Sequence, residues 1–309
     1  MLDSRLGAWL EQVNRHTAQS DDIESAAAPE AVRRNLEKMT AQFVSAGPDV
    51  AWVEDRFVEA LGRSVGVRLY DPAPGRAKPV AAFLHGGGHM AGSVAVYDPI
   101  CRRIAQASGW LIVSVEYRLT PEHPYPAGLD DCLHVVRHIW PLLESEDRLF
   151  ERRLALVGDS GGGALAATIS AAAQHDPTLA IDTQVLIYPS LDYTLDQASV
   201  NDNGQGYLLE RARMVWYFDH YFQQHEDRRA VSPLYLPITP DLPATLVISA
   251  GYCPLRDESM AYVERLAANG VSYRHRHFAD MIHAYLNLEA LVPEVCAETY
   301  REIGRFLSR

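Results

Sequence analysis

A glycine-rich heptapeptide places the strongest constraint on how this chain folds. Residues 157–163 read Val-Gly-Asp-Ser-Gly-Gly-Gly and lie between a short apolar run and the alanine-rich run 164–173. The spacing Gly-x-Ser-x-Gly is typical of a strand that turns sharply into a helix with the serine at the turn. Side chains two residues before and after that serine would collide across the turn, which explains Gly158 and Gly162. The pattern therefore predicts a strained, exposed hydroxyl at Ser160.

Strand-like and helix-like segments alternate around this turn from residue 53 onward. Because a short turn at Gly62 joins the first two strands, they are expected to pair antiparallel, whereas helices separate the later strands, which should be parallel. The result is an α/β three-layer sandwich around an eight-stranded, mostly parallel sheet. The expected strands lie near 53–58, 64–70, 79–84, 110–116, 153–158, 184–188, 244–250 and 272–278, and the expected helices at 96–108, 127–139, 160–175, 256–269 and 294–308.

Two segments do not follow this alternation. Residues 3–46 predict two amphipathic helices around a polar break at 19–24, with Pro29 placed to start the second. Between the sixth and seventh strands lie a polar loop, an aromatic helix and a proline-rich return, at the end of the sheet where open α/β folds bind ligands. We expect N-terminal cap helices at 1–48, a cap insertion at 191–240, and a core formed by 49–190 and 241–309.

Composition excludes several classes of partner. The 309 residues carry a formal charge of −12, which repels nucleic acid, and no apolar run is long enough to span a membrane. The four cysteines show neither metal-site spacing nor the density of a disulfide scaffold. We expect a reducing, cytoplasmic setting in which most thiols pack in the core.

Ser160 can act as a nucleophile only if a base takes its proton and donors stabilise the oxyanion. The run His85-Gly86-Gly87-Gly88 follows an apolar strand, and its glycines let backbone N–H groups converge on a substrate oxygen. We expect the oxyanion donors to be Gly87, Gly88 and Gly161. His85 precedes the glycines and is expected to have a structural role.

The expected base is His283, because it follows the last predicted strand. The competing residues His275 and His277 alternate within that strand, where a structural role is expected. His123, between Pro121 and Pro124, is typical of a turn.

Five motifs occur in a family-specific order: the His-Gly-Gly-Gly run, residues 115–127, the Gly-Asp-Ser-Gly-Gly-Gly run, residues 254–258 and residues 281–283. From about residue 30 to the end, the chain resembles bacterial hormone-sensitive-lipase-like carboxylesterases, most closely the acetyl-esterase branch. The resemblance implies a capped α/β-hydrolase fold and hydrolysis of small, short-chain acyl esters through an acyl-enzyme, without metal or organic cofactor. The partner is then a small-molecule ester, and the oligomeric state, a homodimer included, stays open.

The chain departs from the family pattern at three positions. Gly161 replaces an alanine, which should keep the N–H but loosen the helix start by up to about 1 kcal/mol. His89 replaces a common aromatic residue and should make the pocket floor or entrance more polar. Cys253 stands where the family has the acid that supports the histidine. A thiol cannot match a carboxylate in stabilising the imidazolium, and loss of that charge typically costs about 10⁴-fold in turnover.

Three explanations for Cys253 are open. Asp257 could substitute, since it would lie about one helical turn from position 253, although a salt-bridging or capping role is more common for such a residue. Asp192, after the sixth strand, could face the histidine or stabilise its own loop. Alternatively, Cys253 is an introduced change, or a natural loss that leaves a slow enzyme or a binding protein.

The sequence thus supports two functions of different classes. We expect a carboxylesterase, because the nucleophile, the base and the oxyanion loop are all present. The alternative is a non-catalytic ligand-binding member of the same fold, comparable to the plant gibberellin receptors, which lack a triad residue.

Overall fold

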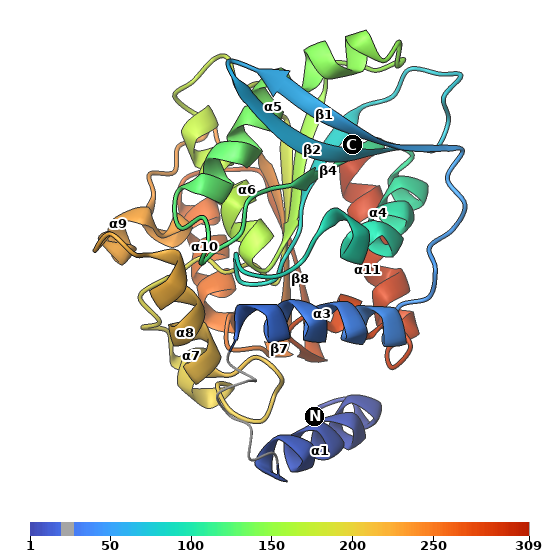
Figure 1. Ribbon diagram of the computed structural model, residues 1–309. Helices are drawn as coiled ribbons and strands as arrows, with labels where there is room; N and C mark the ends of the chain where they lie inside the picture. The colour runs from blue at the N-terminus through green and yellow to red at the C-terminus, as the bar shows by residue number, and fades with distance from the viewer. Residues whose placement is uncertain (20–27, 309) are drawn as a thin grey trace.

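A computed structural model describes residues 1–19 and 28–308. One eight-stranded sheet runs through the molecule in the order β1-β2-β4-β3-β5-β6-β7-β8 (Figure 1). β1 pairs antiparallel with β2, and β2 with β4, whereas every pair from β4 to β8 is parallel. The strands are β1 Trp52–Ala60, β2 Arg63–Asp71, β3 Val80–Leu84, β4 Leu111–Glu116, β5 Leu154–Asp159, β6 Thr183–Ile187, β7 Ala244–Tyr252 and β8 Tyr273–Ile282.

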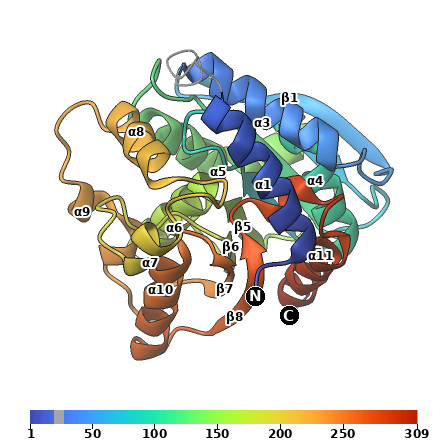
Figure 2. The same ribbon diagram turned by 90° about the horizontal axis from the view of Figure 1, so that it is seen from below.

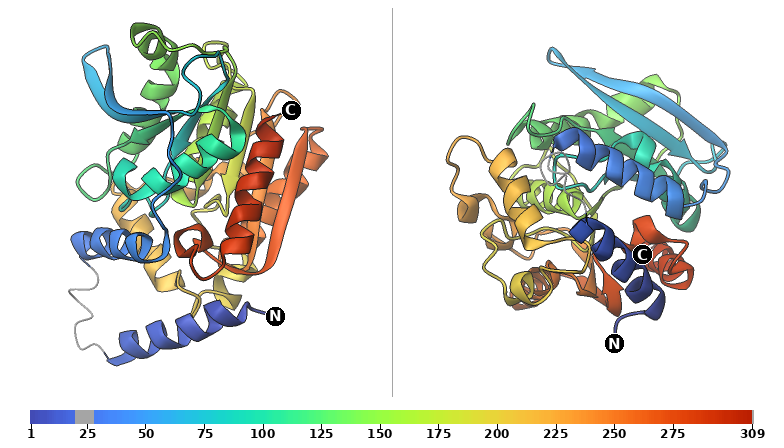
Figure 3. Two further views of the ribbon diagram at one scale, coloured as in Figure 1. Left: turned by 90° about the vertical axis from the view of Figure 1, so that its right-hand side faces the viewer. Right: turned by 60° about the horizontal axis from the view of Figure 1, so that its bottom comes forward.

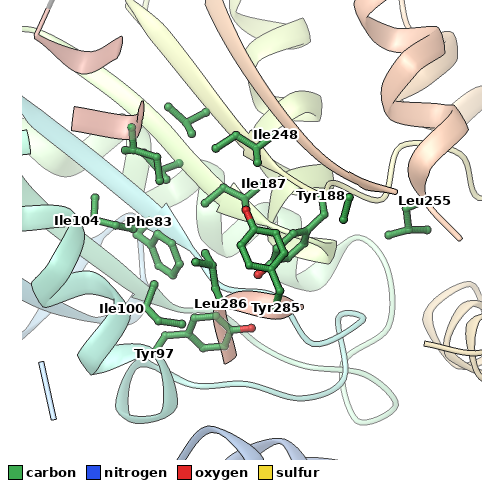
Figure 4. Close-up of a cluster of buried hydrophobic side chains, with 14 of the residues drawn as sticks. Phe83, Tyr97, Ile100, Ile104, Ile187, Tyr188, Ile248, Leu255, Tyr285 and Leu286 are labelled. Carbon is green, nitrogen blue, oxygen red and sulfur yellow. The ribbon is translucent and has the colours of Figure 1, made fainter. Parts of the chain in front are cut away.

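Helices cover both faces of the sheet. α4 and α11 pack on one face, and α5, α6 and α10 on the other, as alternating strand side chains require. Figure 4 shows part of the first layer, where Phe83 of β3 meets Tyr97 and Ile100 of α4. The helices are α1 Ser4–Gln19, α3 Pro29–Phe43, α4 Val94–Ser108, α5 Ala127–Ser145, α6 Gly161–Ala173, α7 Ala198–Asp202, α8 Arg211–Tyr221, α9 Arg228–Val231, α10 Arg256–Ala268 and α11 Pro293–Leu307, with the 3₁₀ turns η1 Pro233–Tyr235 and η2 Tyr285–Leu288.

The predicted three-layer α/β sandwich is confirmed, including all eight strands and the antiparallel first pair. Pro29 begins α3, as expected, while most of the polar break at 19–24 lies outside the described residues. β8 continues to Ile282, four residues past its predicted end, with an irregular register against β7 between Ala250 and Tyr252. The histidine at 283 therefore follows the strand directly.

Helices from two distant parts of the sequence meet at one end of the molecule. α1 and α3 lie at the same end of the molecule as α7 and α8, below the sheet in Figure 1 and toward the viewer in Figure 2, which shows the molecule from below. The views in Figure 3 show the same arrangement, with α1 outermost. Leu6 and Leu10 of α1 are buried in the main core cluster, and Asn14 donates to the carbonyl of Gly206. The N-terminal helices are thus packed onto the body and onto the 191–240 segment.

Three of the four cysteines are buried within the helix layers, which confirms their expected role in the core. Cys101 lies in α4, Cys132 in α5 and Cys296 in α11, and none is in a disulfide. None of the helices in the described ranges is both long and apolar enough to span a membrane.

A buried ion pair fastens the loop between β2 and β3. Lys78 Nζ lies 2.8 Å from Asp71 Oδ1, and their side chains are 3% and 0% exposed. The backbone N–H of Ala73 also donates to Asp71 Oδ1. Removing the lysine would leave a carboxylate buried without its counter-charge.

We therefore expect Lys78→Met to lower the free energy of unfolding by about 3–5 kcal/mol, the usual cost of breaking a buried pair from one side. Urea unfolding measures this loss. Lys38→Met, on the exposed face of α3, is the control and should unfold like the parent. Equal urea midpoints for Lys78→Met and the parent would contradict the assignment.

Candidate active site

Ser160 lies at the sharp junction between β5 and α6. Its backbone has φ 52° and ψ −120°, a conformation that costs free energy for a residue with a Cβ. A Cβ on Gly158 would meet the carbonyl of Gly162, and one on Gly162 would meet the carbonyl of Leu84 in β3. The predicted collision across the turn is confirmed for Gly158, whereas Gly162 is required by the close approach of the turn to the neighbouring strand.

His283 reaches the serine from the end of β8, three strands away from β5 in the sheet. Its Nε2 lies 2.9 Å from Ser160 Oγ, so the two side chains form a hydrogen bond. The ring also packs edge-to-face on Tyr188, with centroids 5.0 Å apart. The residue is only 6% exposed, and burial lowers the pKa of His283 to about 3. The imidazole is therefore neutral, as a proton acceptor must be.

Cys253 contacts the second ring nitrogen of this histidine. It directly follows β7, and its Sγ lies 3.2 Å from His283 Nδ1. The N–H of Leu255 donates to the same sulfur at 3.3 Å, and Asn203 Nδ2 donates to the Cys253 carbonyl. Burial raises the pKa of the Cys253 thiol well above its ordinary value. The group facing Nδ1 is thus an uncharged thiol.

Asp257, considered above as a substitute acid, has its hydrogen bonds elsewhere. Arg256 Nε donates to Oδ1 at 2.7 Å, and the backbone N–H of Ser199 donates to Oδ2 at 2.9 Å. The hydrogen bond from Arg256 lowers the pKa of the Asp257 carboxyl. These are the salt-bridging and capping contacts that the sequence offered as the other interpretation.

Asp192, the second substitute, stabilises its own loop. It accepts hydrogen bonds from Thr194, Gln197 and Tyr235. Among the described contacts, neither Asp192 nor Asp257 bonds to His283. The structure brings Cys253 to the imidazole and holds both carboxylates away from it.

The His-Gly-Gly-Gly run follows β3 and lies against the start of α6. Gly87 and Gly88 have φ values of 116° and 64°, which favour glycine. Gly86 N–H donates to Asp159 Oδ1 at 2.7 Å, tying this loop to the serine turn. The position of a Cβ on Gly161 would lie 3.4 Å from the Gly88 nitrogen, so the loop and the helix start are in close contact. No described hydrogen bond occupies the N–H groups of Gly87 and Gly88.

Two histidines in this loop are packing residues. His85 is fully buried and stacks on Tyr117, with ring centroids 4.3 Å apart, consistent with the structural role expected for it. His89 stacks on Tyr221 at 4.0 Å, and its Nε2 lies 3.3 Å from Tyr193 OH. His89 is buried and lines the cavity beside the serine, so it contributes to the pocket wall.

The two competing histidines of β8 form a separate cluster. His275 Nε2 and His277 Nδ1 lie 2.8 and 2.9 Å from the hydroxyl of Ser249. These contacts lie away from Ser160 and agree with the structural role predicted for both. Within the described ranges, no three side chains of the His, Cys, Asp and Glu types gather as a metal ion would require.

A cavity of about 240 Å³ opens beside Ser160 and His283. Helices α3 and α8 provide eight of its 23 lining residues, and the sequence did not show how these two helices face it. The helical stripe of α3 has the spacing of core residues, and only the fold places part of it over the serine. The apolar lining includes Val32, Leu36, Met39, Leu208, Leu209, Met214, Tyr217, Phe218 and Leu255.

Comparisons with known proteins agree with this site. Residues 81–287 match a family described as the alpha/beta hydrolase fold. The chain is 32% identical to an esterase of Mycobacterium tuberculosis, LipI, covering 88% of this chain and 86% of that one. It is 31% identical to an ethyl acetate hydrolase of Pseudomonas putida, covering 95% and 94%.

The solved structures that resemble this chain are also α/β-hydrolases and esterases. A Ser161Ala mutant of an alpha/beta hydrolase enzyme from the metagenome of Lake Arreo superposes with a TM-score of 0.89 at 31% identity, covering 99% of this chain and 98% of that one. A thermostable esterase from Pseudomonas putida gives a TM-score of 0.87 at 28% identity, covering 99% and 96%. Motifs, fold and relatives therefore agree that the chain belongs to the α/β-hydrolase family, in its hormone-sensitive-lipase-like group.

Proposed function

We propose that this protein is a carboxylesterase that hydrolyses small, short-chain acyl esters through an acyl-enzyme on Ser160. The observation that carries the proposal is the 2.9 Å hydrogen bond between Ser160 Oγ and His283 Nε2 at the base of an apolar cavity. Relatives of the chain that bear esterase names cover most of its length, which supports the same reaction class. The cavity volume suits a small substrate.

The proposed reaction uses the chain's own groups in sequence. Ser160 Oγ attacks the ester carbonyl while His283 Nε2 takes its proton. The N–H groups of Gly87, Gly88 and Gly161 donate to the resulting oxyanion. The ester C–O bond then breaks, and the imidazolium gives its proton to the departing alcohol. Water attacks the acyl-serine in the same way, which releases the acid and restores the serine.

Cys253 makes this enzyme slow. A carboxylate only accepts hydrogen bonds, so it would hold His283 with its proton on Nδ1 and Nε2 free to act as base. A thiol both donates and accepts, so it allows the other tautomer as well, in which Nε2 carries the proton. The thiol also offers no negative charge to stabilise the imidazolium. Both effects lower turnover but leave the oxyanion donors and the nucleophile in place.

The same thiol favours one alternative, a ligand-binding protein without turnover. Labelling with a fluorophosphonate separates the two, because the probe bonds only to an activated serine. We expect labelling of the parent protein at Ser160, slower than for typical serine esterases, and none for Ser160→Ala. If neither the parent nor Cys253→Asp is labelled, the esterase proposal fails and the binding function is favoured.

Restoring the acid should raise activity. We expect Cys253→Asp to increase kcat on p-nitrophenyl acetate or butyrate by up to about 10⁴-fold, because the carboxylate fixes the productive tautomer and stabilises the imidazolium. Cys253→Asn is the matched neutral control and should give no such gain. Asp257→Ala should leave the parent's kcat nearly unchanged. No gain from Cys253→Asp together with a collapse in Asp257→Ala would assign the acid role to Asp257.

The pH dependence of kcat/KM should change with the same substitution. His283 must be neutral to accept a proton, so activity falls as pH drops through its pKa. In the parent, burial lowers that pKa to about 3, and kcat/KM should stay level down to pH 5. In Cys253→Asp the nearby negative charge favours the imidazolium and raises the pKa, which moves the acid limb to higher pH. Superimposable acid limbs would show that position 253 does not act on His283.

A further inference from the structure

Helix α3 contacts two loops of the site that follow strands far apart in the sequence. The oxyanion loop follows β3, and the histidine loop, residues 283–290, follows β8. Arg33 and Thr40 lie seven residues apart on α3, so they share one side of the helix, about 10 Å apart along its axis. Arg33 is bonded to the chain that follows the oxyanion glycines, and Thr40 is bonded to the histidine loop itself.

Arg33 binds the chain just beyond the oxyanion glycines. Its Nε donates to the carbonyl of Met90 at 2.9 Å, and its Nη2 to the carbonyl of Thr120 at 3.0 Å. The N–H of Thr120 donates in turn to the carbonyl of His89 at 2.9 Å. The guanidinium also forms a two-pronged ion pair with Glu122. Arg33 thereby binds both the residue that follows His89, Met90, and the segment 120–122, which is itself bonded to His89.

The other end of α3 binds the histidine loop. Asn287 Nδ2 donates to Thr40 Oγ1 at 3.0 Å, and both side chains are buried. The N–H of Ala290 donates to the carbonyl of Phe43 at 2.8 Å. Asn287 lies only four residues after His283, and its N–H donates to the carbonyl of Ala284. The position of the imidazole is thus linked to the C-terminal part of α3.

We propose that α3 is a strap that keeps the oxyanion loop and the histidine loop in register, with Arg33 and Thr40 as positioning residues. Its kinetic consequence rests on the proposed esterase function. A helix is stiff along its axis, and a displacement of about 1 Å between reacting groups can cost 10²-fold in rate. The Arg33–Glu122 pair is 30% and 48% exposed, so its direct contribution to stability is small. The bonds to the Met90 and Thr120 carbonyls are what position the loop.

Hydrogen–deuterium exchange on the full chain tests the strap without relying on catalysis. We expect Arg33→Met to speed amide exchange in peptides covering 85–92, and Thr40→Val to speed it in peptides covering 283–290. Arg34→Met, a neighbouring exposed arginine on α3, is the matched control and should exchange like the parent. Should Arg33→Met fail to fold, Arg33→Lys keeps the charge but cannot reach both carbonyls at once. Parental exchange in both loops of both variants would overturn the proposal.

Kinetics on p-nitrophenyl acetate tests the consequence for catalysis. We expect Arg33→Met and Thr40→Val to lower kcat by about 10- to 100-fold with little change in KM, because the misplaced groups act on the transition state. Glu122→Gln, which keeps the carbonyl contacts of Arg33, should lose far less. Faster loop exchange with an unchanged kcat would refute the positioning role. If the variants show faster loop exchange but the parent neither hydrolyses the ester nor reacts with the fluorophosphonate, the strap proposal stands and the esterase proposal fails.

Discussion

The close packing of the serine turn against β3 is the constraint on which the rest of this structure depends. Ser160 has a positive φ, and the turn closes only because Gly158 and Gly162 let backbone groups meet without side chains. The contact between Gly162 and Leu84 also brings the end of β3, and hence the proposed oxyanion donors Gly87 and Gly88, beside the serine. The Gly86 bond to Asp159 fastens the same junction. In our proposal, one steric arrangement therefore presents the nucleophile and brings the oxyanion donors beside it.

The histidine side of the site is held by weaker interactions. His283 is fixed by the Ser160 hydroxyl, the face of Tyr188 and a thiol that prefers no single tautomer. Because the buried thiol is neutral, no charge compensates the imidazolium that the proposed reaction forms. Ser160, His283 and Cys253 have the arrangement of a Ser-His-acid triad, but a neutral thiol takes the place of the carboxylate. In our proposal, the site therefore keeps its ability to bind an ester and to attack it, but its turnover rate is low.

The cavity is completed by segments that contribute nothing to the sheet. Helix α3 comes from the N-terminus and α8 from the insertion after β6, and both line the same cavity. In our proposal α3 does more than cover the serine, because its polar side chains hold the oxyanion and histidine loops together. Apolar side chains on one stripe of α3 face the cavity, while Arg33 and Thr40 on an adjacent stripe carry the hydrogen bonds.

The sequence by itself determined the α/β sandwich, the serine turn and which histidine contacts Ser160, because strand alternation, glycine spacing and chain order are local or sequential signals. It also located the unusual Cys253. Only the tertiary structure decided which group faces the imidazole, since Cys253 and Asp257 lie four residues apart, and the fold directs the first to His283 and the second to Arg256 and Ser199. The same holds for α3, whose stripe has the spacing of ordinary core residues. Contacts across more than two hundred residues, such as that between Thr40 and Asn287, leave no local pattern from which they could be predicted.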